Sequence, residues 1–294
     1  MAGGLNGPDP SAPFKPHRLI FEQETSQAVD ELRRPAIGLL ASGAIAGAAI
    51  GIGAFAAAAV AAHAADVPGL YLRLLLSSAL AVGFIIAIMG RTDVFTEYTT
   101  IAIFPVLIGT APLGSLLRLW AYVYASNVVG AAAFGMLAAR LALELQLFDR
   151  AAAAMLVEGL AGHPYWVLGI SAFVAGWLMG LLSWLITAGR DTISQVFFIG
   201  IVTGLIGFAH LHHCVSWTAE GALALSLGAV TLQEVARVLV WATLGNAAGG
   251  VVFAVMVRYG ALLGDDDKRG RDRDRREDSA QLRHGSGSTD ERSE

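Results

Sequence analysis

The same residue pattern occurs twice in this chain, at 118–134 and at 237–253, which is an offset of 119 positions. The first copy reads RLWAYVYASNVVGAAAF and the second reads RVLVWATLGNAAGGVVF, so that Asn127 falls on Asn246. Each copy lies in a long apolar segment. An asparagine at the same place in both indicates two copies of one membrane unit, a pattern typical of channels and transporters.

Apolar stretches long enough to cross a bilayer, which takes about 20 helical residues, occur six times, near 36–62, 69–90, 118–145, 164–188, 192–213 and 231–260. The second and fifth are followed by short apolar pieces, so both are predicted to be broken helices. Three crossings per half reverse the direction of the chain. The sequence therefore predicts an all-α membrane protein with six transmembrane helices in two inverted three-helix repeats, 36–145 and 164–262.

Charge is concentrated at the end of the chain, because residues 265–294 hold 18 of the 44 charged side chains. The tail 263–294 is predicted to be disordered, and the first 35 residues to hold an amphipathic helix at 21–34. No basic face exists outside the mixed-sign tail, so no nucleic-acid partner is expected. Membrane lipid is the expected surrounding of the apolar segments. The distribution of lysine and arginine favours an inner-membrane protein with both termini in the cytoplasm.

Polar residues interrupt the second apolar stretch in the segment GRTDVFTEYTTIAIFP, residues 90–105. Irregular backbone at membrane depth survives only where protein buries it or water reaches it. Thr96 places a hydroxyl at the start of the following half-helix, and free N–H groups there attract anions. The alternative interpretation is an ordinary surface loop.

The matching break in the second half reads GFAHLHHC, residues 207–214. An ionisable residue inside a membrane segment indicates function by default, and His210 lies two residues after the apolar Phe208. Proton or anion handling is favoured over a histidine that only bonds another helix. Three histidines next to Cys214 leave a metal site as a further alternative, although no second cluster supplies more ligands.

The paired asparagines, Asn127 and Asn246, have two interpretations. Amide side chains commonly bond one membrane helix to another, so both residues are expected to hold the broken segments in place. The alternative is that they face the pore beside Thr96 and His210.

Several of these motifs, taken together, resemble the formate/nitrite transporter family over residues 20–262. They are VFTEYTT (94–100), GFAH (207–210), W-x-x-V-Y-x-x-N-x-x-G (120–130), A-G-R (188–190) and G-N-x-x-G (245–249). The resemblance implies an aquaporin-like fold, a homopentamer with one pore in each protomer, and a small monovalent anion or its acid as substrate. It also implies that His210 is the central pore histidine, that Thr96 is its partner, and that Val94 and Phe95 belong to the constriction.

The chain departs from the family pattern at four places. Ala209 stands where the family has glutamate, Cys214 and Gly176 stand where asparagine is usual, and the loop VEGLAGHPYW lacks the usual lysine. The sequence therefore predicts a divergent channel or proton-linked transporter, not an enzyme and without a cofactor. A weak acid would pass Phe95 and Phe208 after exchanging a proton with His210. The rival predictions are a metal- or haem-binding membrane protein that uses the HLHHC cluster, and a pore for neutral solutes.

Overall fold

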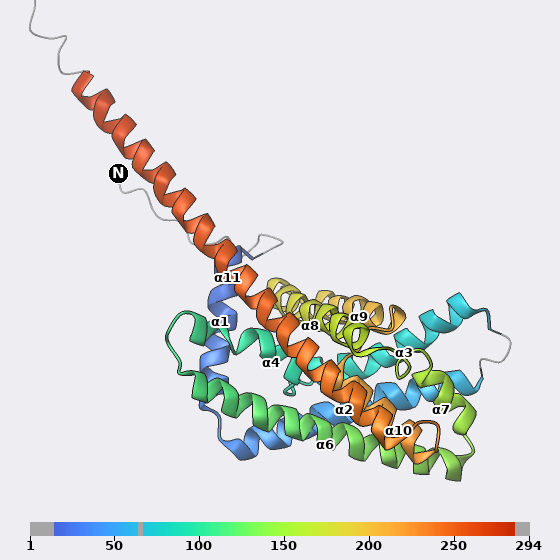
Figure 1. Ribbon diagram of the computed structural model, residues 1–294. Coiled ribbons are helices and arrows are strands. Elements are labelled where there is room, and N and C mark those ends of the chain that lie inside the picture. The colour runs from blue at the N-terminus through green and yellow to red at the C-terminus, as the bar shows by residue number, and fades with distance from the viewer. Residues whose placement is uncertain (1–14, 64–66, 286–294) are drawn as a thin grey trace, which may run out of the picture. The chain divides into compact units, whose positions relative to one another are not determined.

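The computed structural model describes residues 15–63 and 67–285, with side chains up to residue 260. Every regular element in the described part is an α-helix (Figure 1). The helices are α1(His17–Arg33), α2(Ala36–Ala62), α3(Gly69–Met89), α4(Phe95–Ile101), α5(Phe104–Leu107), α6(Leu113–Leu145), α7(Arg150–Val157), α8(Tyr165–Ala188), α9(Thr192–Phe208), α10(Cys214–Ser226) and α11(Leu232–Gly285).

Among the described residues, five helices are long and apolar enough to cross a membrane: α2, α3, α6, α8 and the part of α11 from residue 232 to 260. The predicted fifth crossing, 192–213, is shorter than expected. Its helix α9 has 17 residues and ends at Phe208, and the chain resumes as α10 at Cys214. The fifth crossing is therefore a broken helix made of α9 and α10, as the second is made of α3 and α4.

Close contacts at glycines show in which direction the first three crossings run relative to one another. A Cβ at Gly47 would lie 2.2 Å from the carbonyl oxygen of Asn127, and one at Gly51 would meet Phe134. Contacts that advance together along both helices mean that α2 and α6 run parallel. By contrast, Gly53 meets Leu80 while Gly83 meets Ala49 and Ile50, so α3 runs antiparallel to α2.

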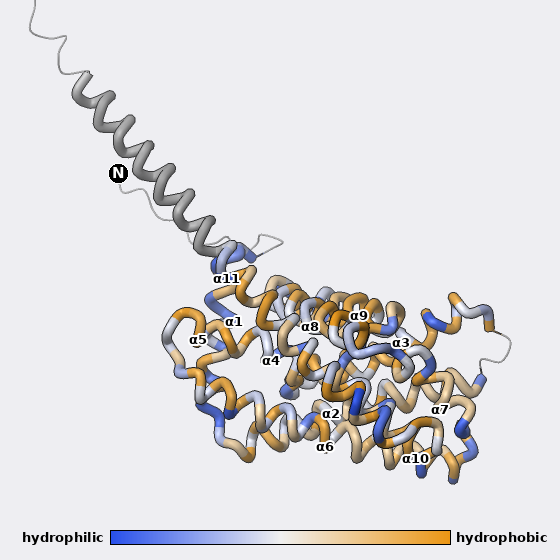
Figure 2. The backbone as a smooth tube through the Cα atoms, in the orientation of Figure 1, coloured by the Kyte–Doolittle hydropathy of each residue, from blue (hydrophilic) through white to orange (hydrophobic). Residues whose placement is uncertain are grey.

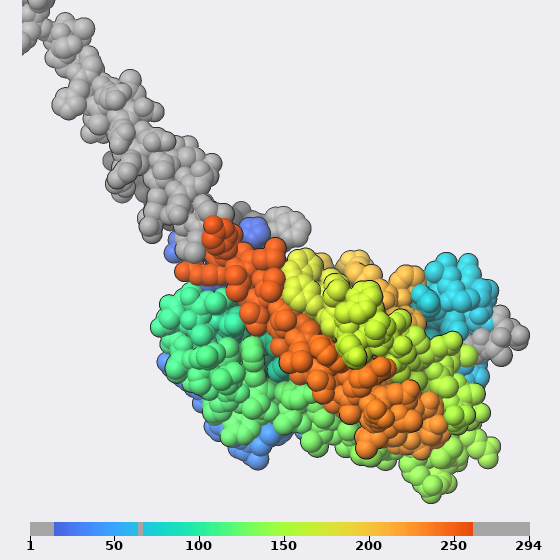
Figure 3. All heavy atoms as spheres, in the orientation of Figure 1, coloured from blue at the N-terminus to red at the C-terminus, as the bar shows by residue number. Residues whose placement is uncertain are grey.

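The second half repeats this arrangement, because Gly176 touches Asn246 and Gly180 touches Phe253, so that α8 and α11 also run parallel. Figure 3 shows these two helices against each other along one face of the molecule. Since each half crosses three times, the second half starts on the side where the first one ends. The two halves are therefore inverted, as predicted.

Apolar residues predominate along these helices (Figure 2), and many of the large ones are exposed. Large exposed side chains include Ile45 on α2, Leu74 on α3, Val129 on α6, Ile170 on α8 and Phe197 on α9. Exposed apolar surface of this extent is unfavourable in water but matches a lipid environment. The chain is a membrane protein.

The two ends of the chain differ from each other in structure. Helix α1 buries Ile20, Glu24, Ala28 and Leu32, one residue per turn, against α4, α5, α6 and α8. The chain from Val255 onward forms a separate unit, in which α11 continues as far as Gly285. The helix thus runs into the region 263–294 for which the sequence predicts disorder, and that disorder stays a prediction. Residues 286–294 lie outside the described part.

A candidate pore where the two helix breaks meet

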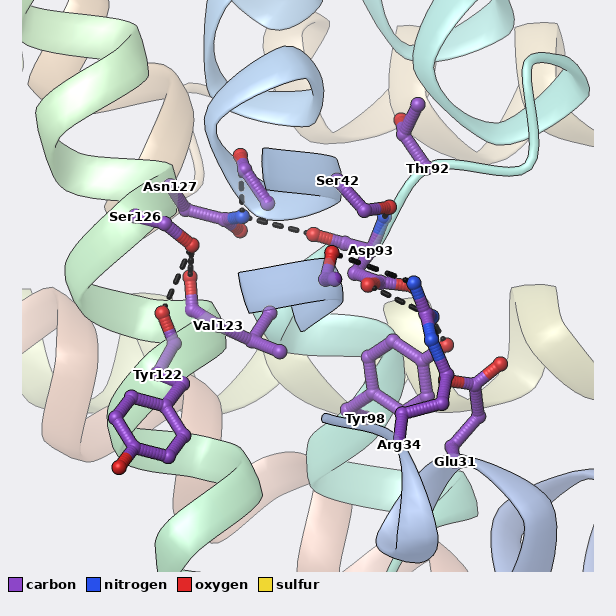
Figure 4. A network of polar contacts seen from close by, with 12 residues as sticks. Glu31, Arg34, Ser42, Thr92, Asp93, Tyr98, Tyr122, Val123, Ser126 and Asn127 are labelled. Atoms are coloured by element: carbon purple, nitrogen blue, oxygen red, sulfur yellow. Dashed lines mark hydrogen bonds and ion pairs between the residues drawn. The ribbon is translucent and has the colours of Figure 1, made fainter. Parts of the chain in front are cut away.

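The first break is held by the side chain of Asn127, which is fully buried. Its Oδ1 accepts a hydrogen bond from the backbone N–H of Phe95 (2.8 Å), the first residue of α4. Its Nδ2 donates to the carbonyl oxygens of Gly43 (2.9 Å) and Asp93 (2.8 Å). Figure 4 shows the bond to Asp93. One amide thereby ties α2, the break and α4 to α6.

The second break is held in the same way by Asn246. Its Oδ1 accepts from the backbone N–H of Cys214 (2.8 Å), and its Nδ2 donates to the carbonyl oxygens of Ala172 (2.7 Å) and His212 (2.9 Å). Each asparagine therefore makes two hydrogen bonds to backbone groups that the broken helix leaves unpaired and a third to a carbonyl of a neighbouring helix, α2 or α8. Neither side chain is among those that line the two cavities described below.

The helices that lead into the breaks end in equivalent caps. After α3, the N–H groups of Arg91 and Thr92 bond the carbonyls of Ile88 and Ala87. After α9, His210 and Leu211 bond Gly207 and Ile206 in the same pattern. This is a Schellman cap, whose C′ residue adopts positive φ and is usually glycine.

Here the C′ residues are Arg91 (φ 52°) and His210 (φ 51°), again 119 positions apart. A side chain in this conformation costs about 1 kcal/mol or more. His210 therefore ends α9, just as Arg91 ends α3, and it lies four residues before Cys214, the first residue of α10.

The side chain that meets Thr96 is His213, so the expected pairing of Thr96 with His210 is wrong. Thr96 Oγ1 lies 2.8 Å from His213 Nε2, and both side chains are almost fully buried. His213 Nδ1 accepts from the backbone N–H of Ser216 at 3.3 Å and caps α10. A neutral imidazole with this acceptor carries its proton on Nε2 and donates it to the Thr96 hydroxyl.

The cavity on the His213 side of the breaks, about 680 Å³ including its open mouth, is called here the His213 cavity. Its polar lining comes mainly from the second half, with Arg73 and Ser77 added from α3: Arg73, Ser77, Thr203, His210, His212, His213, Ser216 and Glu220. Phe84 of α3 also lines it, with its ring edge-on to the imidazole of His213 at a centroid distance of 4.9 Å.

A second cavity, about 1420 Å³ including its mouth, lies beside the first break and is called here the Asp93 cavity. Residues that line it correspond through the offset of 119 to residues of the His213 cavity: Arg91 to His210, Asp93 to His212, Glu97 to Ser216, Tyr98 to Trp217 and Ile101 to Glu220. Because the halves are inverted, the two cavities open towards opposite sides of the membrane. The Thr96–His213 contact joins the half-helix of one cavity to the cap of the other.

The apolar residues expected at the constriction lie in different surroundings. Val94 is fully buried and corresponds to His213 by the same offset. The ring of Phe95 packs against Tyr124 (4.9 Å) and Trp120 (6.3 Å) of α6. Phe208 is half-buried and is not among the residues lining the His213 cavity, where Phe84 provides the aromatic surface instead.

An ion-pair network ties α1 to the first break (Figure 4). Arg34 Nη1 lies 3.0 Å from both carboxylate oxygens of Asp93 and 2.6 Å from Glu31 Oε2. Tyr98 donates its hydroxyl to Asp93 at 2.9 Å. Burial raises the pKa of Glu31, and the Arg34 guanidinium opposes that shift. The carboxylate of Asp93 is thereby neutralised locally, and Asp30 and Glu97 share the lining of this cavity with Lys15 and Arg91.

The histidines of the second break do not converge on a common point. His212 uses one ring nitrogen on Ser171 Oγ (2.8 Å) and the other on the carbonyl of Leu160 (3.0 Å). Both nitrogens of His213 are engaged as well, and Cys214 is buried. Within the described ranges, no three histidine, cysteine or acidic side chains are placed to hold a metal ion. The geometry therefore does not favour a metal or haem site.

Comparison with known proteins agrees with this arrangement. A model of the family described as "Formate/nitrite transporter" matches residues 18–260. The chain belongs to that family. Among curated proteins it is similar to "Inner membrane protein YfdC" of Escherichia coli (strain K12), with 28% identity over 244 residues, which cover 81% of this chain and 76% of that one.

Two solved structures share the fold of this family member. An "FNT family ion channel" superposes with a TM-score of 0.73 at 21% identity, covering 82% of this chain and 98% of its own. A "Pentameric formate channel with formate bound" superposes with a TM-score of 0.64 at 22% identity, covering 81% and 99%. These likenesses establish the aquaporin-like helical fold predicted from the sequence.

Proposed function

We propose that this protein is a channel for small monovalent weak acids such as formate or nitrite, and that they cross at the contact between Thr96 and His213. The observation that carries the proposal is this contact itself. It is the place where the half-helices of two inverted repeats meet, between cavities that open in opposite directions. Ligand sites at the junction of broken helices are characteristic of such folds.

The chemistry of the junction suits a small anion that arrives from the His213 cavity. A carboxylate that leaves water needs hydrogen-bond donors, since burial of an unpaired charge costs many kcal/mol. The Thr96 hydroxyl, which accepts from His213, keeps its own proton to donate, and the Nε2–H of His213 becomes a second donor when the anion takes the place of Thr96. The positive end of the α10 dipole lies at the same point. We assign to His213 the role that the sequence motif suggested for His210. His210, whose ring lines the same cavity, becomes a residue of the approach.

Passage beyond the junction favours the neutral acid over its anion. Arg34 compensates Asp93 and Glu31, and Lys15 and Arg91 line the cavity with Asp30 and Glu97. The Asp93 cavity therefore offers an anion no excess of positive charge, whereas a neutral acid needs none. Buried Val94 and the aromatic cluster around Phe95 give the junction an apolar wall. The same lining supports, as the second candidate, a pore that passes neutral solutes.

We propose a homopentamer with one pore per protomer. The apolar outer faces of the helices, including Ile45, Val129 and Ile170, supply surface that either lipid or neighbouring protomers can cover. The solved pentameric formate channel supplies the precedent for an arrangement of this fold. Native mass spectrometry in mild detergent should give five chains per particle, and a stable monomer would contradict this assembly.

Flux into liposomes tests the function. Formate, acetate, nitrite and a neutral solute such as formamide would be offered to the reconstituted protein while the internal pH is recorded. We expect the weak acids to enter faster than through empty liposomes. His213→Asn and Thr96→Val should slow them at least about tenfold, because the shorter asparagine replaces only the Nδ1 side of the imidazole and loses the Nε2–H, and valine has no hydroxyl. His210→Asn is the matched control and should have a smaller effect. Entry of formamide alone would favour the second candidate.

A further inference from the structure

One buried carboxyl group in the His213 cavity has no counterpart in the other half. Glu220 lies near the middle of α10, is 4% exposed, and lines this cavity together with His213 and Arg73. Its Oε1 accepts a hydrogen bond from Ser216 Oγ at 3.0 Å, one turn earlier on the same helix. All residues of α10 from Cys214 to Ala224 are buried, so this group is enclosed by the protomer and not by lipid.

The packing of a half-helix does not require a carboxyl group at this position. The equivalent position of α4, by the offset of 119, is Ile101, which is 2% exposed and lines the Asp93 cavity. An apolar side chain therefore fills the same place in the first repeat. Ionisable side chains inside membrane segments are expensive and are retained where they take part in the passage of ions or protons.

The surroundings of Glu220 offer it no permanent counter-ion. Within the described residues its carboxyl forms no ion pair, and its bonded partner Ser216 is neutral. The charged or titratable groups that share its cavity are Arg73 on α3 and the three histidines of the second break. Of the helices packed on its other sides, α2 has no charged residue, Arg140 and Glu144 of α6 and Arg150 of α7 are exposed, and Glu234 of α11 is bonded to Thr231. Two further cations of these helices are bonded elsewhere, Arg118 to the carbonyls of Leu32 and Arg34 and Arg237 to the carbonyl of Ala161.

We propose that Glu220 is the proton-exchange residue of the permeation path, an inference that rests on the proposed function. Protonated Glu220 transfers its proton from the carboxyl oxygen to a carboxylate oxygen of the anion held in the His213 cavity. The O–H bond of Glu220 breaks as the O–H bond of the neutral acid forms, and Glu220 is left as a carboxylate. Water at the mouth of the cavity, between Arg73 and His210, then returns a proton to it. Movement in the opposite direction reverses these steps.

The test is flux of formate into liposomes at external pH values from 5 to 8, with internal pH recorded. Glu220→Gln keeps the size of the side chain and an acceptor for Ser216 but cannot release a proton. We expect it to lose the acceleration of formate entry at low pH, at least about tenfold at pH 5. Glu220→Asp should retain a slower, pH-dependent flux. Ser226→Ala is the matched control on the same helix; its hydroxyl bonds only the carbonyl of Ala222 and does not line the cavity, so this variant should retain the pH dependence.

The outcomes separate this proposal from the function on which it rests. If wild-type protein carries no weak acid, the proposed function fails. If wild-type protein carries formate and Glu220→Gln shows the same pH profile and the same internal acidification, only the role of Glu220 is overturned. If Glu220→Gln does not assemble, infrared difference spectra of wild-type protein and Glu220→Asp on addition of formate decide. A protonated-carboxyl band that changes with formate and shifts in Glu220→Asp supports the role, and an unchanged band refutes it.

Discussion

Replacing Asn127 by alanine should lower the free energy of unfolding, because the side chain holds the first break with three hydrogen bonds. The substitution removes three hydrogen bonds and leaves two buried groups of the break without a partner, the N–H of Phe95 and the carbonyl of Asp93, while the carbonyl of Gly43 keeps its bond within α2. Side-chain hydrogen bonds between membrane helices average about 0.6 kcal/mol, so the lower limit is about 2 kcal/mol. Each buried group left unpaired costs about 1–3 kcal/mol, so the upper range approaches roughly 6 kcal/mol, near the stability of many domains.

The assay is thermal unfolding of purified protein in detergent, followed by size-exclusion chromatography, together with formate flux in liposomes. Asn127→Ala and Asn246→Ala should lower the midpoint by similar amounts and should reduce flux, because each amide holds one break in the same way. Ser126→Ala is the matched control. Its hydroxyl bonds only carbonyls of its own helix, at Tyr122 and Val123. Normal stability and flux in Asn127→Ala would refute the argument that this amide holds the break.

Three further outcomes follow from buried groups. Burial raises the pKa of Glu24 on α1 to about 8, against the opposing effect of nearby Thr187, and neither carboxyl oxygen has a regular hydrogen bond. Because this pKa is above the unfolded value, docking of α1 should weaken as pH rises from about 5 to 8. Hydrogen exchange of α1 should therefore become faster over this range, and Glu24→Gln should remove the pH dependence. Gly47→Leu should prevent assembly, since even its Cβ would lie 2.2 Å from the carbonyl oxygen of Asn127, whereas Gly114→Leu, with open space around it, should assemble normally by size exclusion. Arg34→Ala should lower the melting temperature by about 6 °C or more, because buried Asp93 loses its cation at a cost of about 3–5 kcal/mol and about 1 kcal/mol corresponds to about 2–4 °C in a large chain. A melting temperature equal to that of wild-type protein would contradict this.

The repeat in the sequence was sufficient to predict most of the fold. Its offset of 119 aligns Asn127 with Asn246, and the structure shows both side chains making the same three bonds at a helix break. Periodicity could not show that α9 ends at Phe208, since the cap uses His210 in a conformation usually reserved for glycine. The polar, mixed-sign composition beyond residue 263 likewise does not distinguish a disordered tail from a solvated helix.

The candidate site was predicted less well than the fold. The motif GFAH predicted His210 as the pore histidine. The repeat offset, applied to Val94 immediately before α4, instead indicates His213 immediately before α10. That signal was present in the sequence. Three other residues of the cavity, Arg73, Phe84 and Glu220, carried no such signal in the sequence. The first two lie on α3 and the third lies in the middle of α10, and they meet only because the two halves pack together. No spacing in the sequence indicates that they share a cavity.

The central claim is that a weak acid crosses within each protomer at the contact of Thr96 with His213. The most direct test is an electron cryo-microscopy structure of the reconstituted protein in the presence of formate. We expect five copies of the chain and density for the anion within hydrogen-bond distance of His213 Nε2 and Thr96 Oγ1 in each of them. Density confined to His210, or a permeating ion only on the axis between protomers, would contradict the claim.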